Sequence, residues 1–224
     1  MFVQVAFDDD RSQMNEKSEV LAHRKTLQLK AAREFVDEEK QRNFSVFVGT
    51  WNVGNKPPPA DLSPWIPGNK YDIYVIGTQE CDYKLDLGKT VQQDFQESLA
   101  TAIGSADDYK VISSHNLWQM RIYIFARVGI AKHLTNVKSH TEGTGIAGVG
   151  GNKGAVVVSM DIRDSRVCFV NSHLAAHQDK SKKRNEDVAE IIRGEELLSV
   201  AHQMELDSIR NRQAFVLATR ILIS

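Results

Sequence analysis

The chain has 224 residues, of which 42% are hydrophobic and 25% charged, with a formal net charge of −1. This is the composition of an ordinary globular domain, and the charge gives no general attraction to nucleic acid or to an anionic membrane. No run approaches the ~18 apolar residues that span a bilayer. The mostly apolar residues 2–7 are followed at once by three aspartates, which is unlike a secretory signal. The two cysteines have no metal or redox spacing, so we expect reduced thiols in a cytoplasmic protein.

The first half of the chain predicts a helix and then two buried strands. Residues 12–42 are rich in charged residues and glutamine and contain no glycine or proline, which predicts an exposed helical extension over residues 1–42. Apolar runs over 44–52 and 71–77 predict strands, and each run leads into polar residues. The proline-rich segment from Pro57 to Pro67 predicts a stiff loop between them.

The second half alternates between helical and strand patterns. Residues 90–103 predict a helix that ends at Gly104, and 109–113 and 118–128 predict strands. A polar, glycine-rich loop is expected over 133–151. The remaining expected elements are a strand pair at 155–162 and 166–171, a helical region from 181 onward, and an apolar terminal strand at 214–218. Helices between and after the strands indicate a mixed α/β protein.

Asn52 and Glu80 come at the ends of the first two predicted strands. If these strand ends lie side by side, an amide and a carboxylate meet there. Oxygen ligands of this kind hold hard divalent cations, and Mg²⁺ typically takes only one or two protein carboxylates. The alternatives are a turn-forming asparagine and a surface glutamate.

A second polar group surrounds the later strand pair. Asn152 and Lys153 are flanked by glycines, which let a backbone approach a bulky anion, and the lysine supplies a point charge for phosphate. Twenty residues after Lys153, a strand ends at His173, which can donate a hydrogen bond to a phosphoryl oxygen. His177 either caps the next helix or borders a ligand, while Arg184 and Asn185 are expected to support loop geometry.

Five ordered segments resemble the catalytic domain of the inositol polyphosphate 5-phosphatases, Mg²⁺-dependent enzymes that share a fold with DNase I. The matching segments are Thr50-Trp51-Asn52, Thr78-Gln79-Glu80, Thr144-Gly145-Ile146 leading to Gly151-Asn152-Lys153-Gly154, Asn171 to His177, and Arg184-Asn185-Glu186-Asp187. Residues 54–59 and 71–80 further resemble the branch that acts on 3,4,5-phosphorylated phosphoinositides. Residues 174–177 are more similar to other branches, so the sub-family stays open.

The resemblance implies a four-layer α/β/β/α sandwich of the DNase I type over residues 43–224. It implies hydrolysis of the 5-phosphate of a phosphoinositide headgroup or a soluble inositol polyphosphate, with peripheral contact at the cytosolic membrane face and no nucleic acid. Glu80 and Asn52 would hold Mg²⁺, and His173 and Asn52 would act in catalysis. The implied substrate contacts are Asn152, Lys153, Asn171 and His177.

Two later family motifs, Trp-x-Gly-Asp-x-Asn-Tyr-Arg and Trp-Cys-Asp-Arg, do not occur in this sequence, which contains no Gly-Asp dipeptide. We therefore expect the chain to match the N-terminal and central part of the domain, to be incomplete at its C-terminus and to be a poor phosphatase alone. The alternative is a non-catalytic phosphoinositide-binding or regulatory fragment. A nuclease of the same fold is a third reading, which the net charge and the Asn152-Lys153 pair disfavour.

Overall fold

The computed structural model describes residues 24–30, 44–85, 88–144, 153–163 and 165–194, and the backbone of 215–218. The chain divides into two compact units, Met1–Phe44 and Ser45–Ser224. In the first unit, residues 24–30 form a helix whose side chains are exposed. The rest of the helix predicted over 12–42 lies outside the described residues, and so do the predicted helical positions 197–204.

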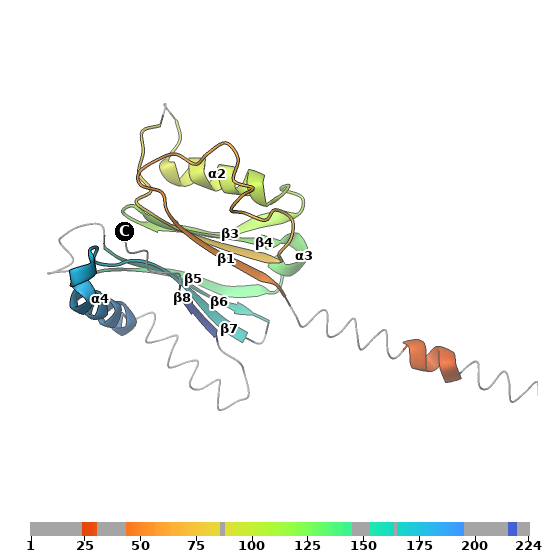
Figure 1. Ribbon diagram of the computed structural model, residues 1–224. Coiled ribbons are helices and arrows are strands. Elements are labelled where there is room, and N and C mark those ends of the chain that lie inside the picture. The colour runs from red at the N-terminus through yellow and green to blue at the C-terminus, as the bar shows by residue number, and fades with distance from the viewer. Residues whose placement is uncertain are drawn as a thin grey trace, which may run out of the picture. The chain divides into compact units, whose positions relative to one another are not determined.

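The first sheet of the second unit contains four strands in the order β1-β2-β4-β3 (Figure 1). They are β1 (Val46–Asn52), β2 (Ile73–Gln79), β3 (Tyr109–Leu117) and β4 (Met120–Arg127). β1 and β2 are parallel and Asn52 lies opposite Gln79, while β4 is antiparallel to both of its neighbours. The parallel pair therefore brings two carboxyl ends to the same edge of the sheet, which is the condition on which the predicted cation site depends.

The second sheet has the order β5-β6-β7-β8. Its strands are β5 (Leu134–Gly143), β6 (Gly154–Ile162), β7 (Ser165–His173) and β8 (Phe215–Ala218), of which β8 runs parallel to β7. The β6–β7 hairpin and the terminal strand lie where the sequence predicted them. The loop predicted over 133–151 was wrong for 134–143, which form β5. Most of β5 is polar because it is an edge strand with little buried surface, and pairing with β6 determines its conformation.

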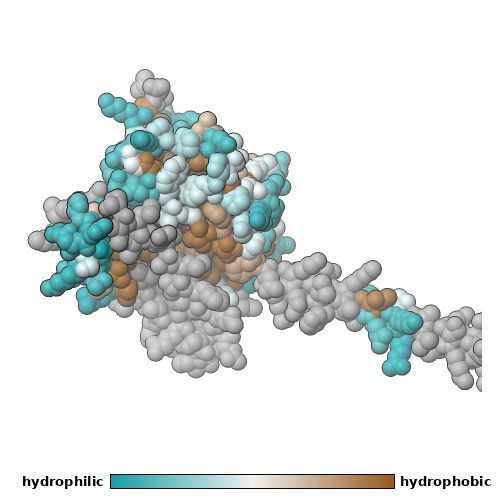
Figure 2. All heavy atoms as spheres, viewed as in Figure 1, coloured by the Kyte–Doolittle hydropathy of each residue, from teal (hydrophilic) through white to brown (hydrophobic). Residues whose placement is uncertain are grey.

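The two sheets pack face to face: β3 contacts β5 and β6, β4 contacts β6 and β7, and β2 contacts β7. Helix α2 (Val91–Ile103) packs on β3 and β4 of the first sheet, and α4 (Ser181–Arg193) packs on β6 of the second. Two short helices, α3 (Val128–Ala131) and η2 (Gln178–Lys180), complete the described elements. Figure 1 shows the resulting α/β/β/α layers, which confirm the predicted sandwich. The outer face of α4 is hydrophilic (Figure 2).

Helix α2 is capped at both ends. Thr90 Oγ1 accepts a hydrogen bond from Gln93 N, and Gln93 Oε1 accepts one from Thr90 N, which forms a capping box. At the other end, Gly104 N donates to Ala100 O. The predicted helix over 90–103 is thereby confirmed, and its buried Phe95 and Leu99 pack against the first sheet.

Successive side chains of a strand point to opposite faces of its sheet, so each strand contributes to two different hydrophobic layers. Tyr74 and Ile76 of β2 belong to the cluster that includes α2, so residues 73, 75 and 77 face the second sheet. In β7, Cys168 and Val170 pack toward Ile191 of α4, so residues 167, 169, 171 and 173 face the first sheet. The inter-sheet layer is apolar along most of its length and becomes polar toward the end of β2 and β7.

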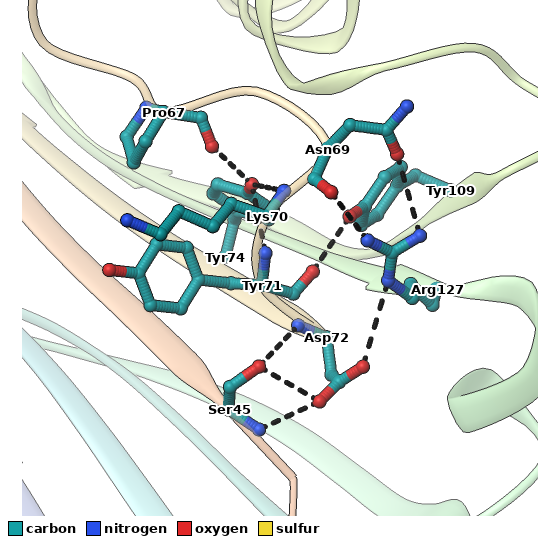
Figure 3. A network of polar contacts seen from close by, with 9 residues as sticks. All are labelled: Ser45, Pro67, Asn69, Lys70, Tyr71, Asp72, Tyr74, Tyr109 and Arg127. Atoms are coloured by element: carbon teal, nitrogen blue, oxygen red, sulfur yellow. Dashed lines mark hydrogen bonds and ion pairs between the residues drawn. The ribbon is translucent and has the colours of Figure 1, made fainter.

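At the opposite end of β1, β2 and β4 lies a network of polar contacts (Figure 3). The Asp72 carboxylate accepts hydrogen bonds from Ser45 N at 2.8 Å and Ser45 Oγ at 2.9 Å. Arg127 Nε lies 3.6 Å from Asp72 Oδ1, and Arg127 Nη2 donates to Asn69 O. The Arg127 guanidinium also lies 4.9 Å from the centre of the Tyr109 ring. These contacts join the starts of β1 and β2 to the end of β4.

Candidate active site

Four polar side chains meet at the edge of the inter-sheet layer, two from each sheet. Asn52 ends β1 and Glu80 follows β2, while Lys153 precedes β6 and His173 ends β7. The register of the second sheet pairs Gly154 with His173, which places Lys153 beside the histidine. The register of the first sheet pairs Asn52 with Gln79, which places Asn52 beside Glu80.

Asn52 and Glu80 form the first-sheet half of the site. Asn52 Nδ2 donates to Glu80 Oε1 at 2.9 Å, and Asn52 Oδ1 accepts from Gly54 N at 3.0 Å. About a third of the Glu80 side chain is exposed (33%). The carboxylate is therefore held by an amide while part of it still faces solvent, which is the arrangement an oxygen ligand needs.

Lys153 and His173 form the second-sheet half. Lys153 Nζ lies 2.7 Å from His173 Nε2, and His173 Nε2 lies 3.7 Å from Glu80 Oε1. A charged lysine can only donate, so a hydrogen bond between these two atoms requires His173 Nε2 to be the acceptor. Burial lowers the pKa of Lys153, and the carboxylates of Glu80 and Asp187 oppose this shift. The charge of Lys153 is thus partly desolvated, where its attraction to an anion is stronger than in water.

Asn171 lies beneath these groups, and its side chain is fully buried. Its Nδ2 donates to Thr78 O at 2.9 Å and to Arg121 O at 2.8 Å, and its Oδ1 accepts from Gln79 Nε2. A methyl group at Gly77 would lie 2.7 Å from both Cγ and Oδ1 of Asn171. The amide therefore joins the two sheets, and the substrate contact that the resemblance implied for Asn171 stays a prediction.

The segment after β7 is held by two buried residues of α4. Arg184 Nη1 donates to Ala175 O at 3.2 Å and to His177 O at 2.6 Å. Asp187 Oδ2 accepts from Ala175 N at 3.0 Å, and Lys183 Nζ lies 3.0 Å from Asp187 Oδ1. The predicted loop-supporting role of Arg184 is confirmed.

His177 and Asn152 are the remaining predicted site residues. His177 precedes η2 with a φ of +73°, and its side chain makes no capping hydrogen bond to that helix. The alternative, that His177 borders a ligand, stays a prediction. Asn152 lies outside the described residues.

The sequence reasoning gave Asp187 no role, although a signal was present. Arg184, Asp187 and Ile191 are the buried residues of α4, at steps of three and four. Two charged residues on the apolar stripe of an amphipathic helix indicate that buried polar partners lie opposite them.

The profile of the Endonuclease/Exonuclease/phosphatase family 2 matches residues 49–219. Phosphatidylinositol 3,4,5-trisphosphate 5-phosphatase 1 of Xenopus laevis is 33% identical in an alignment of 165 residues that covers 67% of this chain and 16% of that protein. Type II inositol 1,4,5-trisphosphate 5-phosphatase of Mus musculus is 31% identical in an alignment of 160 residues that again covers 67% of this chain and 16% of that protein. The chain thus spans only a small part of these relatives.

A solved structure supports the same relationship. The inositol polyphosphate 5-phosphatase domain of SPsynaptojanin, in complex with inositol (1,4)-bisphosphate and calcium ion, superposes with a TM-score of 0.60 at 26% identity. The match covers 72% of this chain and 52% of that one. With a family profile that matches most of its length and a sandwich of the same architecture, the chain belongs to the endonuclease/exonuclease/phosphatase family and is similar to its inositol polyphosphate 5-phosphatases.

Proposed function

We propose that this chain carries a metal-assisted phosphatase site for the 5-phosphate of phosphoinositides or inositol polyphosphates. The observation that carries the proposal is the meeting of Glu80 and Asn52 from one sheet with Lys153 and His173 from the other. A carboxylate with an amide suits a hard cation, and a lysine with a histidine suits a phosphate. The names of the relatives and the ligands of the solved neighbour support this choice of chemistry.

The donor set fits Mg²⁺. No group of three or more histidine, cysteine, aspartate or glutamate side chains gathers within the described ranges, as a protein zinc site would require. Mg²⁺ is typically bound through one or two carboxylates together with waters and substrate phosphates. Glu80 would supply the carboxylate, and the oxygen of Asn52 can accept a second interaction besides the one from Gly54 N. When bound, the cation would polarise the phosphoryl group and offset its developing charge.

Lys153 and His173 would bind the phosphate itself. A phosphate oxygen near Lys153 Nζ would draw the ammonium away from His173 Nε2, because an anion is a stronger acceptor than a neutral imidazole. His173 would then donate from Nε2, as the other neutral tautomer or as imidazolium.

The other residues would act by positioning. Asn171 holds β7 against β2 and would set the separation of the two halves of the site. Asn152, Asn171 and His177 stay candidate substrate contacts from the sequence resemblance. If the substrate is a lipid headgroup, the site must reach the cytosolic membrane surface. Among the described residues, no helix is long and apolar enough to cross a membrane, and we propose peripheral contact.

A second candidate function uses the same groups without turnover. The sequence contains no Gly-Asp dipeptide, whereas the family resemblance places its water-activating aspartate in a Gly-Asp-x-Asn motif. Loss of a general base typically lowers a rate by roughly 10²–10⁴-fold. A chain that keeps Glu80, Lys153 and His173 would still bind phosphorylated headgroups, so a phosphoinositide-binding fragment is the alternative.

Phosphate release and binding separate the two functions. The chain would be incubated with inositol 1,4,5-trisphosphate, or with vesicles that contain phosphatidylinositol 4,5-bisphosphate, in Mg²⁺ and in EDTA. Mg²⁺-dependent release that Glu80→Gln abolishes supports the phosphatase, and Asp72→Asn is the matched carboxylate control. Headgroup-dependent vesicle co-sedimentation that needs Lys153, without release, supports the binding function. Neither release nor binding would contradict both.

A further inference from the structure

The backbone of Glu80 adopts a conformation that side chains rarely take. Its φ is +50°, in the left-handed region that favours glycine. A residue stays in such a conformation only when its surroundings fix the backbone on both sides, and residues of this kind cluster at functional sites. The contacts that hold this backbone also determine the direction of the Glu80 carboxylate, which faces Asn52 and His173.

Both peptide groups that follow Glu80 are held by hydrogen bonds. Glu80 O accepts from Asn55 N at 2.6 Å, and Cys81 N donates to Gln119 O at 2.9 Å. Cys81 O accepts two hydrogen bonds from Arg121, from Nε at 3.1 Å and from Nη2 at 2.8 Å. The peptide plane directly after Glu80 and the next one are therefore both fixed.

Arg121 is built into the protein interior on the face of β4 away from the site. It is buried, and its remaining Nη1 donates to Gln92 Oε1 of α2 at 3.1 Å. The guanidinium thus joins the segment that follows β2 to the first turn of α2. Its planar group can donate two hydrogen bonds to one carbonyl and a third elsewhere, which the single ammonium of a lysine cannot reproduce.

We propose that Arg121 is a positioning residue for Glu80. By holding the Cys81 carbonyl against α2, it maintains the left-handed backbone that directs the Glu80 carboxylate toward Asn52 and His173. Arg121 does not contact the ligand in this scheme and acts only through the backbone of residues 80 and 81. The inference rests on the proposed function in one respect, which is that Glu80 is the metal anchor.

The backbone part of the inference is tested without metal. Amide hydrogen exchange of Asn55 and Cys81 would be compared in the parent chain, Arg121→Lys and Arg121→Met, all in EDTA. The matched control is Arg127→Lys, an arginine at the far end of the same strand. We expect both amides to exchange about tenfold faster in the Arg121 variants and unchanged in the control. Equal exchange in the parent chain and Arg121→Lys would overturn the inference.

The metal part is measured as the Mg²⁺ concentration that gives half of the metal-dependent rise in thermal midpoint. Loss of a residue that orients a metal ligand typically weakens metal binding by about 10–100-fold, and we expect that range for Arg121→Lys and no change for Arg127→Lys. If Glu80→Gln loses the rise while Arg121→Lys keeps the parent concentration, the Arg121 inference fails and the metal assignment stands. If Glu80→Gln responds as the parent does, the metal assignment fails, and the exchange experiment still decides the role of Arg121.

Discussion

The two ends of β1, β2 and β4 use polar residues in opposite ways. At the end shown in Figure 3, the Asp72 carboxylate is surrounded by Ser45 donors and by Arg127, which is itself bound to Asn69. At the other end, Glu80 accepts from an amide and faces His173, and the adjacent Lys153 has a pKa lowered by burial. At the first end, the charged groups of Asp72 and Arg127 are paired with each other. At the second end, the side chains of Glu80, His173 and Lys153 lie close together and part of the Glu80 carboxylate is exposed.

This difference separates stability from function. A carboxylate with its hydrogen bonds made contributes to the free energy of unfolding, whereas an incompletely paired group near other polar groups contributes little and is available to a ligand. Substitutions at the two ends should therefore give opposite results. Substitution of Asp72 should lower stability and leave metal binding intact, and substitution of Glu80 should abolish metal binding and leave the metal-free stability nearly unchanged.

The largest effect is expected for Glu80→Gln. We predict a loss of Mg²⁺-dependent phosphate release of roughly 10²-fold or more, because the transition-state charge loses its main electrostatic support. The Mg²⁺-dependent rise in thermal midpoint should also disappear, since a ligand stabilises only the state that binds it. The metal-free midpoint should stay nearly unchanged. Calorimetry and phosphate release measure these quantities.

Asp72→Asn is the paired control for that experiment. It weakens the contacts with Ser45 and Arg127, and we expect about 1 kcal/mol less unfolding free energy with an unchanged Mg²⁺ response. If Asp72→Asn altered the metal response while Glu80→Gln lowered metal-free stability, the contrast between the two ends would be wrong.

Asn171→Ala should have the largest effect on stability alone. It removes the amide that bonds Thr78 O, Arg121 O and Gln79, and each buried polar group left unpaired costs about 1–3 kcal/mol. We expect a loss of about 3 kcal/mol of unfolding free energy in urea titrations. Asn116→Ala, at an exposed position of β3, should stay within about 0.5 kcal/mol of the parent. Equal losses in the two variants would show that the inter-sheet amide has no special role.

The charge of Lys153 gives a smaller effect that depends on pH. Because burial lowers its pKa, the folded protein loses this charge at a lower pH than the unfolded chain, whose lysines titrate near ~10.4. Affinity for inorganic phosphate should therefore fall as the pH rises through the lowered pKa. The contribution of Lys153 to the free energy of unfolding changes in the opposite direction. It rises over the same pH interval, because the unfolded state binds more protons there.

Lys153→Arg tests whether the charge of Lys153 causes this pH dependence. An arginine keeps its charge, so phosphate affinity should persist to higher pH in this variant. Lys153→Ala should raise KM for multiply phosphorylated substrates about tenfold with less change in kcat, because the charge meets a phosphate that does not react. An alkaline limit that stays at the same pH in Lys153→Arg would exclude Lys153 as its source.

The smallest effect is expected at the Figure 3 end, for Tyr109→Phe. The Tyr109 hydroxyl donates to Tyr71 O at 2.7 Å, and burial raises its pKa to about 12. Stability from this group is complete below the ordinary tyrosine pKa near ~10 and is lost as the pH rises through the higher folded value. At neutral pH, the free energy of unfolding of the variant should be about 1 kcal/mol below that of the parent. As the pH rises further, the free energy of unfolding should fall less in the variant than in the parent. An unchanged alkaline slope would contradict the assignment.

Local signals in the sequence predicted the elements that depend on local interactions. Thr90 and Gly104 delimit α2 because a capping box and a glycine end act within one turn. The apolar runs of β2 and β6 predicted strands because both of their faces are buried. The polar strand β5 was missed because its conformation depends on pairing with β6, which its own residues do not encode.

The same limit applies to the site. The sequence predicted that Asn52 and Glu80 each follow a buried strand, and the parallel pairing of the two strands brings them into a hydrogen bond. The burial of Asn171 was missed because the amide bonds a strand more than ninety residues earlier in the chain, which only the packing of two sheets brings near. The chemical roles of these residues stay proposals that the experiments above test.

The close contact of Gly77 with Asn171 limits which substitutions the protein tolerates at this position. It faces Asn171 so closely that any side chain there would act as a wedge between the sheets. The wedge would lie three residues before Glu80, and it would move that carboxylate away from Lys153 and His173 on the other sheet. A survey of random substitutions for loss of activity should therefore identify Gly77, because its contact with Asn171 in the interior sets the separation of the two halves of the proposed site.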